Sequence, residues 1–69
     1  MDNLDSQTKL SNAIDEYVIG RNAIRDREIL KDNLIDGLSY IDLETKYNIS
    51  QSSIKTILRK RKQQIFKHF

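Results

Sequence analysis

The chain lacks cysteine and proline altogether and has two glycines and a single histidine among its 69 residues. Without cysteine it forms neither a disulfide scaffold nor a thiolate metal site, and His68 alone makes no histidine cluster. No apolar run approaches the roughly 20 residues of a membrane span, and the polar, acidic residues 1–5 are unlike a signal peptide. We therefore expect a cytoplasmic protein with no metal, no other cofactor and no membrane partner.

The sequence also lacks any sign of a β-strand or of a boundary between domains. No segment alternates apolar and polar residues, and neither a glycine-rich linker nor an internal repeat divides the chain. A chain of this length is near the lower limit at which a single hydrophobic core stabilises a fold without disulfides or metal ions. We predict an all-α fold. Residues 1–8 are expected to be a flexible N-terminus, and residues 9–69 a small four-helix domain that ends in a helix-turn-helix.

Acidic residues are missing from the C-terminal third of the chain. Residues 45–69 have seven bases and no acid, whereas residues 1–44 have ten acids and five bases, so charges of +7 and −5 give the net charge of +2. Like charges gathered along one helix repel one another unless an anionic partner offsets them. Either this end faces a polyanion, or the basic run at residues 59–62 complements the C-terminal end of its helix dipole and remains solvated.

The first half of the chain contains two segments with helical spacing of apolar residues. One predicts a helix over residues 9–19, with Ser6 or Ser11 as its N-cap and Gly20 as its stop. The other predicts a helix after the candidate N-cap Asn22, ending before Gly37 and burying Ala23 or Ile24 with Ile29, Leu30 and Leu34. Its outer side mixes both charges, which we expect to form local ion pairs in solvent: Arg25, Asp26, Glu28, Lys31 and Asp32.

Residues 39–61 predict two short amphipathic helices separated by a tight turn. Ser39 is a good N-cap for a helix over residues 40–46, because its hydroxyl accepts from a free backbone N–H two or three residues on. Asn48 tolerates the left-handed backbone that ends a helix, so the turn falls at residues 47–49, with Ile49 filling the corner.

The helix that follows this turn has a polar, basic outer side. Ser50 is its expected N-cap, and Ile54, Ile57 and Leu58 form its inward face. The outward residues are hydrogen-bonding groups and cations, namely Gln51, Ser52, Lys55, Thr56 and Arg59. This pattern is typical of a DNA-reading helix-turn-helix.

Residues 25–65, 41 of the 69, resemble the C-terminal promoter-reading region (region 4) of bacterial sigma factors and the related LuxR-type helix-turn-helix. The matching motifs are RDREIL at residues 25–30, DGLSY at 36–40 and YNIS at 47–50. Glu44 stands where this family usually has Ala or Gly, so either the two helices are spaced wider or Glu44 leans out to solvent. The part of a sigma factor that binds the polymerase core and melts the promoter has no room here.

Helix geometry and the resemblance together predict sequence-specific binding of double-stranded DNA by a small transcription regulator. The expected base-reading residues are Ser50, Gln51, Ser52, Lys55 and Thr56, and the expected phosphate-binding residues are Lys46, Arg59, Lys60 and Lys62. Such stand-alone proteins are typical of phages and mobile elements, which implies a bacterial cell and a nucleoid-associated or phage-encoded protein. The alternatives are a protein-interaction module that binds RNA polymerase or another regulator, and a DNA-binding component of a phage packaging or recombination complex.

The end of the chain is apolar beyond its basic run. Ile65, Phe66 and Phe69 need to be covered, and two arrangements are open. They fold against the first helix around Tyr17 and Val18, or they form the contact of a homodimer, since helix-turn-helix proteins commonly pair on two half-sites.

Catalysis is not expected. The carboxylate pairs at residues 15–16 and 42–44 lie on patterns of exposed helix, and Ser52 and Ser53 have no His or Lys placed to activate them. The two glycines each predict a helix end rather than a phosphate-cradling loop. We therefore expect a binding protein and not an enzyme.

Overall fold

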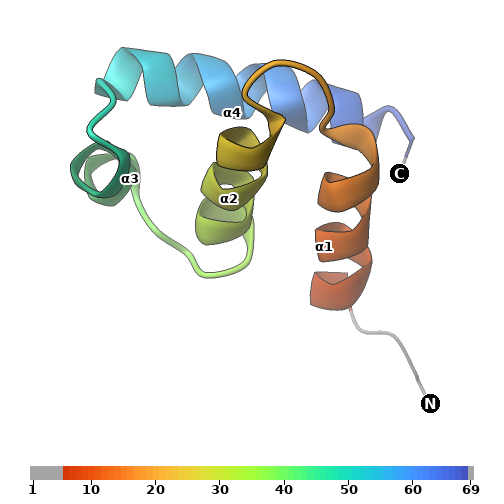
Figure 1. Ribbon diagram of the computed structural model, residues 1–69. Coiled ribbons are helices and arrows are strands. Elements are labelled where there is room, and N and C mark those ends of the chain that lie inside the picture. The colour runs from red at the N-terminus through yellow and green to blue at the C-terminus, as the bar shows by residue number, and fades with distance from the viewer. Residues whose placement is uncertain (1–5, 69) are drawn as a thin grey trace.

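The computed structural model describes residues 6–68, which form four α-helices and no strand (Figure 1). The prediction of a small all-α fold is confirmed. The helices are α1 (Ser6–Tyr17), α2 (Ala23–Leu34), α3 (Tyr40–Tyr47) and α4 (Gln51–Phe66). In Figure 1 the long helix α4 lies across the other three, with α3 near its N-terminal end, α2 in the middle and α1 near its C-terminal end.

α1 begins earlier and ends earlier than predicted. It starts at Ser6 and not at residue 9, so the described part of the predicted flexible N-terminus, residues 6–8, is helical; residues 1–5 lie outside the described residues. It ends at Tyr17 rather than at residue 19, and Gly20 then turns the chain with a φ of 94°. Leu10 and Ala13, which follow the first turn of α1, pack against the core and so stabilise the N-terminal half of this helix.

α2 begins after Asn22, but not for the predicted reason. The Asn22 side chain makes no capping hydrogen bond, and the residue instead has a left-handed backbone with a φ of 63°. Asparagine is one of the few residue types that adopts this conformation at low cost. Asn22 therefore serves the start of α2 through its backbone conformation and not through its side chain. The helix ends before Gly37, as predicted, and Asn33 Nδ2 donates to the Leu38 carbonyl at 2.9 Å to fix the connection to α3.

The ends of α3 and the start of α4 follow the sequence signals. Ser39 and Asp42 form a reciprocal capping box, in which each side chain accepts a hydrogen bond from the other residue's backbone N–H. Asn48 closes α3 in a left-handed conformation with a φ of 56°, and Ser50 caps α4 by accepting from the Ser53 N–H. α3 ends at Tyr47, one residue later than predicted. The two helices are therefore joined by a turn of three residues, 48–50.

All four helices and the α1–α2 connection contribute to one core. Its buried members are Ile14, Val18, Ala23, Ile29, Leu30, Leu43, Ile54, Leu58 and Ile65. Of the two residues left open at the start of α2, Ala23 is buried while Ile24 is 75% exposed. Each fully buried isoleucine or leucine contributes roughly 1.5 to 3 kcal/mol of transfer free energy, so the core supplies most of the cohesion between helices.

The C-terminal end folds back on the domain, so one predicted dimer contact is wrong. Ile65 is fully buried in the same core cluster as Val18 and is not available to a second chain. The Tyr17 and His68 rings stack with centroids 4.3 Å apart, which ties the end of the chain to α1. Phe66 is 52% exposed, and Phe69 lies outside the described residues.

Candidate nucleic-acid interface

α4 begins at a cluster of serine hydroxyls. Ser50 Oγ accepts from the Ser53 N–H at 3.3 Å and donates to Ser53 Oγ at 3.0 Å, and Ser52 Oγ lies 3.3 Å from it. The hydroxyl of Ser50, predicted both to cap the helix and to read bases, is therefore engaged in the cap. The positive end of the helix dipole at this exposed point favours a negatively charged partner.

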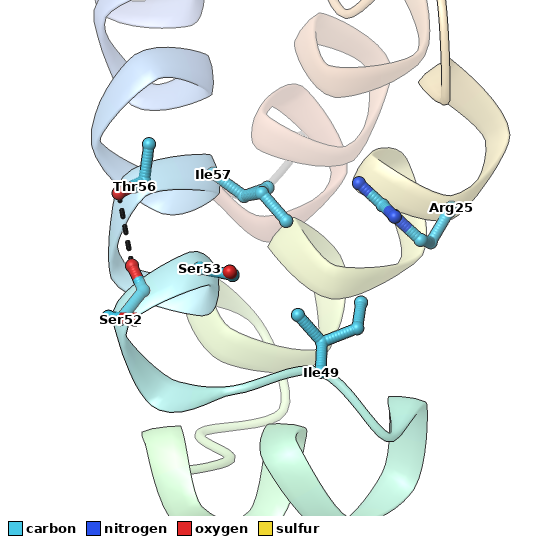
Figure 2. A pocket seen from close by; sticks show the side chains of 6 residues that line it. All are labelled: Arg25, Ile49, Ser52, Ser53, Thr56 and Ile57. Atoms are coloured by element: carbon cyan, nitrogen blue, oxygen red, sulfur yellow. Dashed lines mark hydrogen bonds between the residues drawn. The ribbon is translucent and has the colours of Figure 1, made fainter.

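A hollow of about 400 Å³ opens beside this first turn, between α4 and α2 (Figure 2). Figure 2 shows Arg25 reaching from α2 toward Ile57 of α4. On the α4 side, Thr56 Oγ1 donates to the Ser52 carbonyl at 3.0 Å and lies along the rim. The lining residues are Arg25, Ile49, Ser52, Ser53, Thr56 and Ile57.

Two further hollows continue along α4 toward its C-terminal end. The second, of about 230 Å³, shares Thr56 and Ile57 with the first, and the third, of about 340 Å³, shares Lys60 and Gln64 with the second. Because neighbouring hollows share lining residues, they form one continuous feature, which we call the α4 groove. Its remaining lining residues are Arg21, Asn22, Asp26, Arg61, Gln63 and Lys67.

The α4 groove is positively charged. Its lining holds five bases and one acid, a formal net charge of +4. The one acid, Asp26, is 4% exposed and is bound by two guanidinium groups, those of Arg25 and Arg61. The carboxylate is therefore neutralised within the protein, and the groove presents cations to a ligand.

The predicted base-reading residues lie on two different sides of α4. Ser52 and Thr56 line the α4 groove on the α2 side. Gln51 and Lys55 lie on the α3 side, where Gln51 Nε2 donates to Glu44 Oε1 at 3.3 Å and the Lys55 ammonium lies 5.5 Å from the centre of the Tyr40 ring. Glu44 therefore does not lean out fully into solvent, since it is half-buried and hydrogen-bonded across the turn.

The predicted phosphate-binding residues are also separated. Lys60 lines the α4 groove, and Arg59 is exposed beside it. Lys62 is half-buried and does not line the groove. It lies two residues after Lys60, which places it about 200° further around the helix, away from the groove. Lys46 is on α3, and its ammonium lies 2.8 Å from Asp32 Oδ2, so its charge is already paired within the protein.

Asp26 and Arg61 form a buried ion pair that joins α2 to α4. Arg61 Nε donates to Asp26 Oδ2 at 2.8 Å, and the side chain alone is 13% exposed in Arg61 and 6% exposed in Asp26. The same guanidinium donates to the carbonyls of Ile19 and Arg21 at 3.0 Å each, and so also holds the α1–α2 connection. Placing Asp26 on a solvated side of α2 was wrong, because its partner is 35 residues away in sequence.

Asp32 is the second carboxylate of α2 that is buried against the prediction. It is 9% exposed and accepts hydrogen bonds from Lys46 and from the Tyr47 hydroxyl, both on α3. Burial raises the pKa of Asp32, but the two hydrogen bonds and the Lys46 charge together outweigh it, so the pKa lies below the ordinary 3.8. The hydrogen bond to Asp32 raises the pKa of Lys46, and burial followed by the bond to Asp32 raises the pKa of Tyr47.

The sequence pattern did not identify the contribution of α2 to this surface. Arg21 in the α1–α2 connection and Arg25 in the first turn of α2 line the α4 groove, whereas the prediction confined the interface to α3 and α4. The basic run at residues 59–62 does not indicate that Arg21 and Arg25, more than 30 positions earlier, belong to the same surface. A helical wheel of α2 does place Arg25 one turn before Ile29, but only the packing of α2 on α4 shows which surface it borders.

No protein-family model, curated protein or solved structure matches the chain. Within residues 6–68, no three His, Cys, Asp or Glu side chains are grouped so as to hold a metal ion. No helix in this described part is both long and apolar enough to cross a membrane.

Proposed function

We propose that the protein binds double-stranded DNA through α4, with polar residues in the first half of the helix at the base edges and cations of the α4 groove on the phosphates. The observation that supports this most directly is the +4 charge of the groove lining, along a helix that contains no acidic residue. A cationic, largely open groove beside a polar helix is the electrostatic footprint expected for a polyanion.

The dimensions of α4 fit this role. Its 16 residues span about 24 Å, and the major groove of B-DNA, roughly 12 Å wide, admits one α-helix. Ser52, Lys55 and Thr56 are exposed in its first half and offer donors and acceptors to base edges. Lys60 and Lys67 come one to three turns later, where a recognition helix has passed the bases and runs beside the backbone.

The roles that we propose differ from the sequence prediction at the edges of the site. Gln51, Ser52, Lys55 and Thr56 read bases, while Ser50 caps the helix. The phosphate-binding set loses Lys46, which is paired, and Lys62, which does not line the groove. It gains three residues, Arg21, Arg25 and Lys67, and so consists of Arg21, Arg25, Arg59, Lys60 and Lys67.

Regulation of transcription is the output that we propose for this binding. It rests on the resemblance of residues 25–65 to promoter-reading domains, and it implies a cytoplasmic, nucleoid-associated protein of a bacterium or its phage. Selection of bound sequences from random duplex DNA tests it. A palindromic motif indicates a dimer, and a single asymmetric motif indicates a monomer. No enriched motif contradicts the proposal in favour of a protein-interaction module or of a sequence-independent packaging component.

A salt titration tests the electrostatic part of the proposal. With about five phosphates neutralised, log affinity falls with log salt at a slope of about −4 to −5 between about 50 and 200 mM salt. Lys60→Ala lowers the slope by about one, whereas Lys62→Ala, a matched lysine two residues away, leaves it nearly unchanged. A slope near zero for the wild type excludes DNA as the partner, and equal effects of the two lysines exclude the α4 groove as the phosphate-binding side.

A further inference from the structure

Two side chains of α3 hold two predicted base-reading side chains of α4. Glu44 accepts from Gln51 Nε2 at 3.3 Å, and the Tyr40 ring lies under the Lys55 ammonium at 5.5 Å. Tyr40 and Glu44 are four residues apart on α3, and Gln51 and Lys55 are four residues apart on α4. Residues four apart share a face of a helix, so these two contacts line the same seam between the helices.

The chemistry of the contact fixes the orientation of the Gln51 amide. An ionised carboxylate only accepts hydrogen bonds, so the NH₂ group of Gln51 must face Glu44 and the carbonyl oxygen must face away. One N–H is used by Glu44, which leaves the Oε1 acceptor and the second N–H. A neighbouring acceptor and donor on one amide match adenine in the major groove, where N6–H₂ donates and N7 accepts.

We infer that Glu44 is a positioning residue for DNA specificity, which holds the Gln51 amide in the orientation that recognises adenine at one position of the bound site. This inference rests on the proposed DNA binding and deepens it by naming the base and the residue that selects it. Glu44 does not itself touch the DNA. It acts by removing the second amide orientation, in which the NH₂ and carbonyl groups exchange places and the adenine pattern is lost.

The charge of Glu44 favours a role in specificity over a role in affinity. A carboxylate beside the proposed base-reading residues Gln51 and Lys55 repels DNA of every sequence, so its presence lowers binding to random duplex. A residue whose role was only to link α3 to α4 would not need a charge. The hydrogen bond between Glu44 and Gln51 is also half-exposed, and such a bond adds little to the stability of the fold. The loss of affinity for DNA that the Glu44 carboxylate causes is compensated if the same carboxylate makes binding selective for one base.

Selection from a random duplex library tests the inference, with wild type, Gln51→Ala, Glu44→Ala and Glu44→Gln compared in parallel. The expected wild-type motif contains one adenine that Gln51→Ala loses, with a drop in preference of about tenfold. Glu44→Ala loses the same adenine and no other position, while its affinity for random duplex is equal to or higher than that of wild type. Glu44→Gln presents an amide that donates as well as accepts, so it no longer excludes the second orientation of Gln51, and it weakens the preference for the adenine.

A second measurement replaces that adenine by 7-deaza-adenine, which lacks the N7 acceptor. The wild type loses about tenfold in affinity, whereas Gln51→Ala and Glu44→Ala lose nothing further. The inference is overturned if the motif of Glu44→Ala equals that of wild type, if all positions weaken together, or if Glu44→Gln keeps the full wild-type preference for the adenine. A wild-type protein that enriches no motif instead contradicts the proposed function itself, so the two failures are distinguishable.

Discussion

Asp26 and Asp32 lie six residues apart on α2, and each ties this helix to another, yet the two sites differ in their chemistry. Asp26 is held by two guanidinium groups, and its partner Arg61 is 13% exposed. Asp32 is held by the ammonium group of Lys46, whose side chain is 51% exposed, and by the phenol of Tyr47. Guanidinium does not deprotonate in proteins, whereas ammonium and phenol groups both titrate at alkaline pH. Of the two contacts, the one between α2 and α3 is therefore the one whose groups lose protons at alkaline pH.

The two sites also differ in their relation to the candidate interface. Asp26 lines the α4 groove and neutralises part of its charge, while Asp32 supports α3 from the side of α2. Loss of the first contact therefore affects both folding and the groove. Loss of the second affects mainly the docking of α3, the helix that bears Tyr40 and Glu44.

The largest effect is expected for Arg61→Ala. It removes the bond to Asp26 and the two bonds to loop carbonyls, and leaves a buried carboxylate with Arg25 alone, at a cost of about 3 kcal/mol in the free energy of unfolding. The control is Arg59→Ala, an exposed arginine of the same helix, which changes stability by less than about 0.5 kcal/mol. Urea denaturation followed by circular dichroism measures both, and similar losses for the two variants contradict a special role for Arg61.

A smaller loss is expected for Asp32→Ala, which leaves the Tyr47 hydroxyl without its acceptor and frees Lys46. We expect a decrease of about 2 kcal/mol in the free energy of unfolding, because a half-buried donor loses its partner. Tyr47→Phe removes the donor instead and costs about 1 kcal/mol. If Asp32→Ala is as damaging as Arg61→Ala, the proposed ranking of the two α2 contacts is wrong.

The smallest effect is expected from alkaline pH. The pKa values of Lys46 and Tyr47 are raised in the folded state above 10.5 and 10.0, so above pH 10 the unfolded chain loses protons that the folded protein keeps. Stability is therefore full below pH 10 and falls as the pH rises beyond it. Thermal melting at pH 9 and pH 11 measures the decrease, which is reduced in Tyr47→Phe and unchanged in Glu16→Gln. An equal decrease in Tyr47→Phe and wild type excludes the phenol as a source.

Local signals in the sequence were sufficient for the helix ends around the turn. Ser39, Asn48 and Ser50 act on backbone groups within five residues of themselves, so their roles follow from residue type and spacing alone. Asn22 shows the limit of this reasoning, because an asparagine before a helix fits either a side-chain cap or a left-handed backbone. The all-α fold followed from apolar spacing, which depends on short stretches of chain.

The parts that were not predicted depend on long-range packing. Asp26 and Asp32 have the spacing of surface carboxylates, and only their partners on α3 and α4 make burial tolerable. Lys60, Arg61 and Lys62 are adjacent in sequence and chemically similar, yet Lys60 and Arg61 line the groove, Arg61 also bonds to Asp26 and to two loop carbonyls, and Lys62 does not line the groove. Rotation of 100° per residue separates them, but the direction of the core was known only approximately from the sequence.

The bonds of Arg61 have a consequence for the lifetime of the folded state. They join positions 35 to 42 residues apart and so close a long loop, and we expect them to form after the helices and their local contacts. Interactions that are absent from the folding transition state slow unfolding without accelerating folding. We expect Arg61 to act as a latch that determines how long each molecule stays folded and thereby how seldom the chain is exposed to proteases.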